Sequence, residues 1–270
     1  MVERTYWKEL LPAKLVYVLF NVGASSVQNF LPVYYSTYFN KFEIGLLQTI
    51  PCLCSLLAPP LWGAIARSAP EAAPYVLGLL LVVFLGGTMF GIISAFLMLN
   101  LYELSGGSAQ IVGIAIFCET FSELPAFYFA DAIIDRLGTV KVLAISILAY
   151  GIRLTCYALM TNAWYVLPIE LLHGCTYGLA WAASTKYIFA EVPRGTEGLM
   201  MGILSAVQTG LGRGVGTSVG GYLYNTYGAS YMWAAADMGV PLAFLGLYIF
   251  SCTMPTHKTA TAAESSPLLV

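Results

Sequence analysis

The sequence predicts an all-α membrane protein with eight transmembrane helices. Of its 270 residues, 59% are hydrophobic and only 10% are charged, and the mean hydropathy is +0.76. A soluble domain contains fewer apolar and more charged residues than this. The apolar residues also fall into runs close to the roughly 20 residues that a helix needs to cross a bilayer core of about 30 Å.

Eight such runs follow one another, separated by short polar or charged breaks. They lack the alternation of period two that a membrane barrel requires, so each run is expected to form a helix. The predicted spans are 11–38, 44–66, 74–101, 109–130, 140–160, 164–187, 199–222 and 231–253.

The basic residues between the spans predict the orientation, because short loops rich in Lys and Arg stay on the cytoplasmic side. With a cytoplasmic N-terminus, only Lys41 faces the other side. The basic residues then inside are Arg4, Lys8, Arg67, Arg136, Lys141, Lys186, Arg194 and Lys258. Both termini are therefore predicted to be cytoplasmic, since the number of spans is even.

Several functional classes are disfavoured by the composition. The net charge of −2 leaves no basic stripe for a nucleic acid backbone. The six cysteines lie within or beside apolar runs, which favours buried thiols over disulfides or zinc ligands. The chain contains no phosphate-binding loop and no nucleophile elbow. The sequence therefore predicts no enzyme activity, no cofactor and no metal site.

One predicted cytoplasmic loop, at 130–141, carries a recognisable pattern. It contains Asp131, the pair Asp135 and Arg136, the turn residue Gly138 and the cation Lys141. The pattern resembles the loop signature of the major facilitator superfamily, in which charges and helix ends clasp the cytoplasmic faces of two helices. The resemblance implies a gating loop; the alternative is an ordinary basic loop that obeys the positive-inside rule.

Three further strings narrow this resemblance: SELPAF at 122–127, AYGIR at 149–153 and IELLHG at 169–174. They are similar to one branch of this superfamily, which contains the sugar- and nucleoside-proton symporters and the animal orphans called major facilitator superfamily domain-containing protein 6-like proteins. The similarity extends over about 86–250 and implies the second of two six-helix halves, whereas 11–66 resembles only the first two helices of the first half.

An incomplete fold is therefore expected, in which about four helices of the first half are missing. The predicted parts are an N-terminal remnant at 1–72, a six-helix bundle at 73–254 and a disordered cytoplasmic tail at 255–270.

Three ionisable residues, Arg153, Glu170 and His173, fall at one depth inside predicted spans. Glu170 and His173 are three residues apart, so they share a helix face on which a carboxylate can fix the imidazole tautomer. A carboxylate, a histidine and an arginine at one level are suited to proton coupling, because protonation of one changes its pairing with the others. The alternative is a static ion network that fixes helix packing.

Two carboxylates, Glu119 and Glu123, lie four residues apart near the middle of another span. Adjacent carboxylates in a low dielectric do not both stay charged, so they are predicted to be further protonation sites. The alternative for Glu123 is a hydrated position near the inner face. Arg213 and Asp237 fall at matching depths on adjacent spans and are predicted to form a structural ion pair.

The C-terminal tail ends in Glu264, three spacers, Leu268 and Leu269, followed by Val270. This resembles the acidic dileucine signal that clathrin adaptors bind, which implies an adaptor as partner. It predicts an endosomal or lysosomal membrane, with the plasma membrane as the alternative.

Two functional hypotheses follow. The first is a proton-coupled carrier of a small polar solute, in a shortened form that does not necessarily transport. The second is a non-transporting membrane receptor or regulatory partner whose spans bind other helices.

Overall fold

The computed structural model describes residues 28–65, 74–191 and 197–254. Every regular element in these ranges is a helix, which confirms the predicted all-α class. The longest are α3 (Lys41–Ile65), α4 (Pro74–Leu104), α5 (Ala109–Leu137) and α6 (Thr139–Leu159). The remaining elements are α2 (Leu31–Tyr35), η1 (Ala163–Tyr165), α7 (Val166–Glu170), η2 (Gly174–Leu179), α8 (Ala180–Glu191), α9 (Glu197–Ser205), η3 (Ala206–Gly212), α10 (Arg213–Tyr227), α11 (Ala229–Asp237) and α12 (Gly239–Thr253).

Four segments of the described chain are long and apolar enough to cross a membrane: Leu77–Leu104, Ala109–Leu137, Thr139–Leu159 and Ala229–Thr253. All four coincide with predicted spans. The count of eight remains a prediction. Three predicted features lie outside the described residues: the first span up to residue 27, the end of the second span at residue 66, and the tail with Glu264, Leu268 and Leu269.

Two predicted spans differ from a plain α-helix. The span at 164–187 consists of η1, α7, the π-helix η2 and α8, and the span at 199–222 consists of α9, the π-helix η3 and α10. A π-segment inserts an extra residue into the helical turn and frequently marks a functional site. The periodicity of the sequence did not predict these segments, because a single inserted residue barely alters an apolar run.

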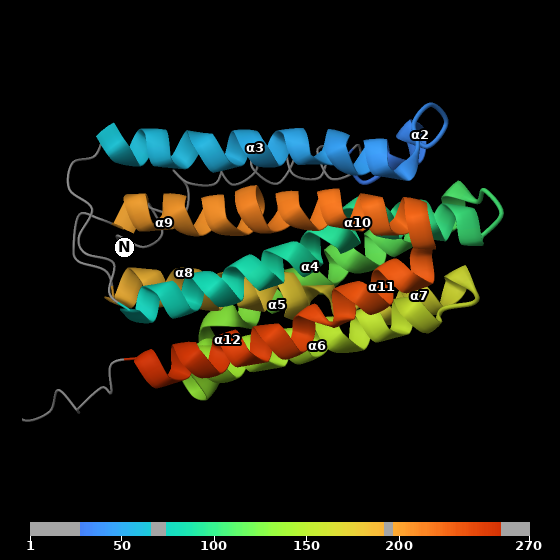
Figure 1. Ribbon diagram of the computed structural model, residues 1–270. Helices are drawn as coiled ribbons and strands as arrows, with labels where there is room; N and C mark the ends of the chain where they lie inside the picture. Colours follow the sequence, from blue (N-terminus) through green and yellow to red (C-terminus); the bar gives the residue numbers. More distant parts are fainter. Residues whose placement is uncertain (1–27, 66–73, 192–196, 255–270) are drawn as a thin grey trace, which may run out of the picture.

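The helices form a bundle of long antiparallel rods (Figure 1). One end of the bundle carries the loop at Gly138 between α5 and α6, and we call it the Gly138 end. The opposite end carries the loops at Gly106 and Gly228, and we call it the Gly106 end. α4 lies against both the α9–η3–α10 rod and α12, α3 covers the outer side of that rod, and α6 packs against α11 and α12.

Glycines allow the backbones of α4 and the η3–α10 segment to touch. A Cβ atom placed on Gly91 would lie 2.5 Å from the carbonyl oxygen of Arg213, and one on Gly216 would lie 2.2 Å from that of Thr88. No side chain fits at such distances, so this glycine-rich region serves helix packing.

At the Gly106 end, a polar cluster joins α3 to α4 and α10. Lys41 Nζ lies 3.0 Å from Glu103 Oε2, and the Tyr224 hydroxyl donates a 2.7 Å hydrogen bond to the same oxygen. The Lys41 ammonium also lies 4.0 Å from the centroid of the Tyr224 ring. Glu103 and Tyr224 were not singled out from the sequence.

Candidate functional site

The centre of the site is Arg153, which α6 places inside the bundle with 0% of its side chain exposed. Its Nη2 atom donates to Glu170 Oε2 at 2.9 Å, and its Nε atom donates to the Tyr157 hydroxyl at 2.9 Å. The Tyr157 hydroxyl in turn donates to the second Glu170 oxygen. Arg153, Tyr157 and Glu170 thus form a closed ring of hydrogen bonds, which we call the sealed triad.

The sealed triad is buried inside the bundle. Glu170 is 0% exposed, like Arg153, and the Tyr157 ring packs against Trp233 at a centroid distance of 5.2 Å. A buried ion pair is tolerated only when hydrogen bonds satisfy both partners. The triad meets this condition, because each Glu170 oxygen has its own donor.

His173 forms the second part of the site, together with Glu119 and Glu123 of α5; we call these three residues the histidine branch. His173 Nε2 lies 3.1 Å from Glu123 Oε1. His173 Nδ1 lies 3.3 Å from Glu119 Oε1 and 3.1 Å from Arg153 Nη1. Each ring nitrogen therefore faces a carboxylate, and Nδ1 faces a guanidinium as well.

The histidine branch reaches the surface of the bundle although His173 does not. The side chains of Glu119 and Glu123 are 20% and 28% exposed, whereas His173 is 2% exposed. Arg153 joins the two parts, because its Nη1 atom contacts His173 and also donates to Thr176 Oγ1 at 2.6 Å.

Local structure explains how these side chains meet. Directly after α7 the chain makes a turn at 171–172 and then enters η2, so Glu170 and His173 project toward different partners. The sequence placed them on one face and paired the carboxylate of Glu170 with the imidazole. In the structure Glu170 binds Arg153 instead, and the carboxylates beside His173 are those of Glu119 and Glu123.

α5 approaches η2 closely at the site. A Cβ atom on Gly174 would lie 2.2 Å from the carbonyl oxygen of Ser122. The Ser122 hydroxyl accepts a 3.0 Å hydrogen bond from the Gly174 amide, which fixes α5 against the segment that carries His173. Ser122 lies between Glu119 and Glu123 in sequence, so this contact sets the height at which both carboxylates reach the imidazole.

The residues of the predicted gate lie at the Gly138 end, but the predicted loop at 130–141 is wrong. α5 continues to Leu137 and α6 begins at Thr139, so only Gly138 lies between the two helices. Asp131 and Asp135 on α5 contact Lys186 Nζ on α8 at 3.1 and 2.8 Å. Gly138 has φ +81° and joins α5 to α6, a conformation that favours glycine. Arg136 and Lys141 are exposed, and neither joins an ion pair within the described ranges.

The predicted ion pair between Arg213 and Asp237 is wrong. Asp237 accepts a 2.9 Å hydrogen bond from the Thr155 hydroxyl on α6, and the Arg213 guanidinium lies 5.5 Å from the centroid of the Phe90 ring on α4. α11 packs on α6 while α10 packs on α3 and α4, so the two side chains face different helices. Equal depth on adjacent spans does not fix the direction of a side chain around its helix.

Three residues of the site were missed from the sequence: Tyr157, Thr176 and Lys186. Two of them had a signal, since Tyr157 lies four residues after Arg153 and Thr176 three residues after His173, on the same helix faces. Lys186 was counted only as a basic residue near the end of a span. The described residues hold no group of three or more His, Cys, Asp or Glu side chains arranged for a metal ion.

A bundle of membrane-length helices around a buried charge cluster defines a multi-pass integral membrane protein. The model of the MFS_1 like family matches residues 71–235, which is more than half of the chain. The chain belongs to this family, and the predicted membership of the major facilitator superfamily is confirmed.

Curated relatives agree with this assignment. The maltose permease of Geobacillus stearothermophilus is 30% identical over 207 residues, which cover 74% of this chain and 52% of the permease. The probable 3-phenylpropionic acid transporter of Escherichia coli is 25% identical, over 53% of this chain and 38% of the transporter. The major facilitator superfamily domain-containing protein 6-like protein B of Xenopus laevis is 23% identical, over 57% of this chain and 25% of the relative. The chain thus spans about half the length of the permease and less of the other two.

Proposed function

We propose that the chain acts in a proton-coupled secondary carrier of a small polar solute, and that His173 is the group whose protonation couples the two. One observation carries the proposal: His173 Nδ1 lies within 3.3 Å of both a guanidinium nitrogen and a carboxylate oxygen. The imidazole can pair with only one of them at a time, and its protonation state decides which.

With a neutral imidazole, Nε2 carries the proton and donates to Glu123, and the bare Nδ1 accepts from Arg153 Nη1. A second proton on Nδ1 turns this nitrogen into a donor to Glu119 and removes the acceptor that Arg153 had. Protonation therefore exchanges the contact of His173 with Arg153 on α6 for a contact with Glu119 on α5.

Net charge supports the same conclusion. The cluster contains three carboxylates, those of Glu119, Glu123 and Glu170, but only one guanidinium, that of Arg153. An added proton reduces the surplus negative charge within the bundle, where charge is poorly solvated. A solute that binds in place of one carboxylate contact would change the affinity for the proton, which is the requirement for coupling.

The test is uptake by the full chain in proteoliposomes under an imposed pH gradient, with radiolabelled maltose as the first solute and other small polar solutes after it. Flux that depends on the gradient and is abolished by His173→Ala supports the proposal. No flux with any solute contradicts it and supports the alternative, a non-transporting receptor or regulatory partner.

The remaining sequence-based predictions extend this proposal. We infer eight spans with both termini cytoplasmic, so that the Gly138 end faces the cytoplasm and Asp131, Asp135, Arg136, Gly138 and Lys141 form the inner gate. We further propose that the chain divides into an N-terminal remnant at 1–72, a six-helix bundle at 73–254 and a cytoplasmic tail at 255–270.

Recognition of Glu264, Leu268 and Leu269 by a clathrin adaptor would direct the protein to endosomal or lysosomal membranes. The double substitution of Leu268→Ala and Leu269→Ala should then leave the protein at the plasma membrane.

A further inference from the structure

Arg213 carries a positive charge in the middle of the bundle. The rod formed by α9, η3 and α10 runs from Glu197 to Tyr227, and Arg213 lies near its centre, about 20 Å from either end at 1.5 Å per residue. This distance is too great for the guanidinium to reach the lipid headgroups by extending along the rod. Because a guanidinium keeps its proton, the charge has to be balanced at this depth.

The carboxylates of the spans have other partners. The eight predicted spans contain only four acidic residues: Glu119, Glu123, Glu170 and Asp237. Glu170 binds Arg153, and the two carboxylates of α5 face His173. Asp237 accepts a hydrogen bond from Thr155. The spans therefore supply no counter-ion to Arg213.

The surroundings of the Arg213 side chain do not replace that counter-ion. The residue is half-buried, and its guanidinium lies 5.5 Å from the centroid of the Phe90 ring on α4. In the part of the chain that the structure describes, the guanidinium forms no ion pair and no hydrogen bond. A cation–π contact offsets only part of the cost of a charge inside a bilayer, so much of the charge stays unbalanced.

The same ring connects Arg213 with the histidine branch. Phe90 stacks on Tyr177 at a centroid distance of 4.9 Å, and its centroid lies 6.1 Å from that of the His173 ring. The guanidinium of Arg213 and the imidazole of His173 thus both border the Phe90 ring. A ligand held by the guanidinium would lie close to the group that we propose to titrate.

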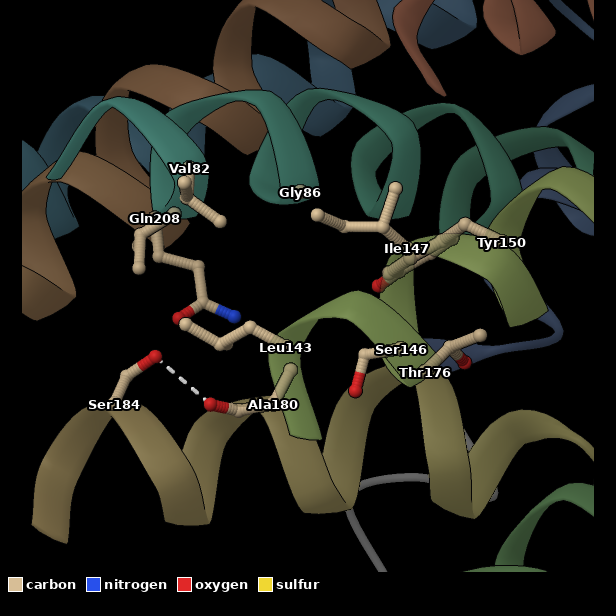
Figure 2. Close-up of a pocket in the computed structure, with 11 residues that line it drawn as sticks. Val82, Gly86, Leu143, Ser146, Ile147, Tyr150, Thr176, Ala180, Ser184 and Gln208 are labelled. Atoms are coloured by element: carbon tan, nitrogen blue, oxygen red, sulfur yellow. Dashed lines mark hydrogen bonds between the residues drawn. The ribbon is translucent and has the colours of Figure 1, made fainter. Parts of the chain in front are cut away.

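Figure 2 shows a cavity that does not fit such a ligand. It lies among α4, α6, the η2–α8 segment and η3, and its volume is about 30 Å³. This is about a tenth of the smallest pockets that hold drug-sized ligands. The side chains that line it are uncharged, and Arg213 is not among them. A solute that takes part in coupling therefore binds outside this cavity.

Charge and shape indicate the class of the ligand. Arg153, the only other arginine in a predicted span, already binds Glu170, so Arg213 offers a single positive charge. A monoanion balances this charge, whereas a phosphate dianion would leave a negative charge in the bundle. A guanidinium binds a carboxylate through two parallel hydrogen bonds, which chloride cannot form. The Phe90 ring offers an apolar surface to the organic part of the ligand.

We infer that Arg213 binds the carboxylate group of a small monoanionic solute, and that the Phe90 ring packs against the organic part of the same solute. This inference rests on the proposed function and names the chemical class of its solute. The anion binds to Arg213 and the proton to His173, so the two cross the membrane together without net charge.

Three variants test the role of the charge. Arg213→Gln removes it, and Arg213→Lys returns it without the two-donor fork. Lys258→Gln is the matched control, because it removes the same charge in the predicted tail. We expect Arg213→Gln to melt at or above the temperature of the wild type, since it loses a charge without a counter-ion. A melting temperature well below that of the wild type would assign Arg213 to helix packing and overturn the inference.

The first measurement is the equilibrium binding of tritiated benzoate and lactate to the full chain in lipid nanodiscs, in a buffer without chloride. We expect saturable binding that excess benzamide, the uncharged analogue of benzoate, does not displace. The affinity should fall by about tenfold or more in Arg213→Gln, fall less in Arg213→Lys and stay within about twofold in Lys258→Gln.

Three results of this measurement would overturn the site. They are a wild type that binds neither carboxylate, equal affinities in the wild type and Arg213→Gln, and displacement of benzoate by equimolar chloride or benzamide.

The second measurement is the uptake of protons from a weakly buffered solution when benzoate is added to the full chain. Besides the Phe90 ring, His173 faces Glu119, Glu123 and Arg153, and a bound anion nearby favours its protonated form. We expect proton uptake in the wild type and in Lys258→Gln, and its loss in His173→Gln.

The two proposals fail in different ways. Benzoate binding that takes up no proton would overturn the proposed function and leave the anion site in place. Maltose uptake driven by a pH gradient, in a chain that binds neither benzoate nor lactate, would overturn the anion site and leave the proposed function in place.

Discussion

The sealed triad and the histidine branch contain the same kinds of group but differ in access and in number of partners. Arg153 and Glu170 are 0% exposed, and both Glu170 oxygens have fixed donors. Glu119 and Glu123 are 20% and 28% exposed, and they share one imidazole that cannot satisfy Arg153 as well when it is protonated. The difference indicates that one part of the cluster is fully buried and fully paired, whereas the other part, a few ångströms away, reaches the surface and has partners that compete for one ring nitrogen.

The largest expected effect comes from breaking the sealed triad. Glu170→Ala leaves the Arg153 guanidinium buried without its counter-ion, which typically costs about 3–5 kcal/mol. We expect loss of the monodisperse folded protein in detergent, measured by size-exclusion chromatography and thermal unfolding. A Glu170→Ala protein that melts like the wild type would show that the triad does not stabilise the bundle.

Removal of the imidazole should separate stability from coupling. His173→Gln keeps a polar side chain that reaches Glu123, so we expect a folded protein that melts close to the wild type. Uptake driven by a pH gradient should fall by about a hundredfold, because a glutamine amide does not titrate. Gradient-driven uptake that survives this change would mean that the histidine branch is structural, like the triad.

Close packing at Gly174 should have an intermediate effect. Gly174→Ala forces α5 and η2 apart, since its Cβ would lie 2.2 Å from the Ser122 carbonyl oxygen. Overpacking of this kind costs about 1–3 kcal/mol. Gly113→Ala, also on α5, is the control, because a Cβ atom at Gly113 would meet no other atom within 4 Å. Equal thermal melts of the two variants would contradict the close approach.

Neutralising a carboxylate of the histidine branch should change uptake more than stability. Glu123→Gln replaces the carboxylate that lies 3.1 Å from His173 Nε2 with an uncharged amide, so a doubly protonated imidazole loses one of its two carboxylate partners. We expect uptake driven by a pH gradient to fall while the melting temperature stays close to that of the wild type. Unchanged gradient-driven uptake would be incompatible with the proposed pairing.

The smallest effect is expected at the Gly138 end. Lys186 contacts Asp131 and Asp135, but both carboxylates are well exposed. Exposed ion pairs contribute little to stability. Lys186→Met should therefore leave the melting temperature unchanged within error, and a large drop would show that this contact holds α5 and α8 together.

Much of this fold was predictable from the sequence, because the apolar runs indicate where the helices lie. Arg153, Glu170 and His173 could be predicted as site residues because ionisable residues are scarce inside the apolar spans. The pairing within the cluster was not predictable. Glu170 and His173 would share partners on a regular helix, but the turn at 171–172 and the π-segment η2 separate them. Depth alone also misassigned Arg213 and Asp237, because packing against different neighbours decides which way each side chain points.

We propose that His173 changes its protonation state and its hydrogen-bond partner together. The chain contains only two histidines, so nitrogen-15 labelling of histidine in a His257→Gln variant leaves a single imidazole signal. At high pH we expect one tautomer, with the proton on Nε2 and a bare Nδ1. At low pH we expect a doubly protonated ring, and the change should occur over the same pH range in which uptake changes. A ring that keeps one protonation state from about pH 5 to 8, while uptake still varies, would contradict it.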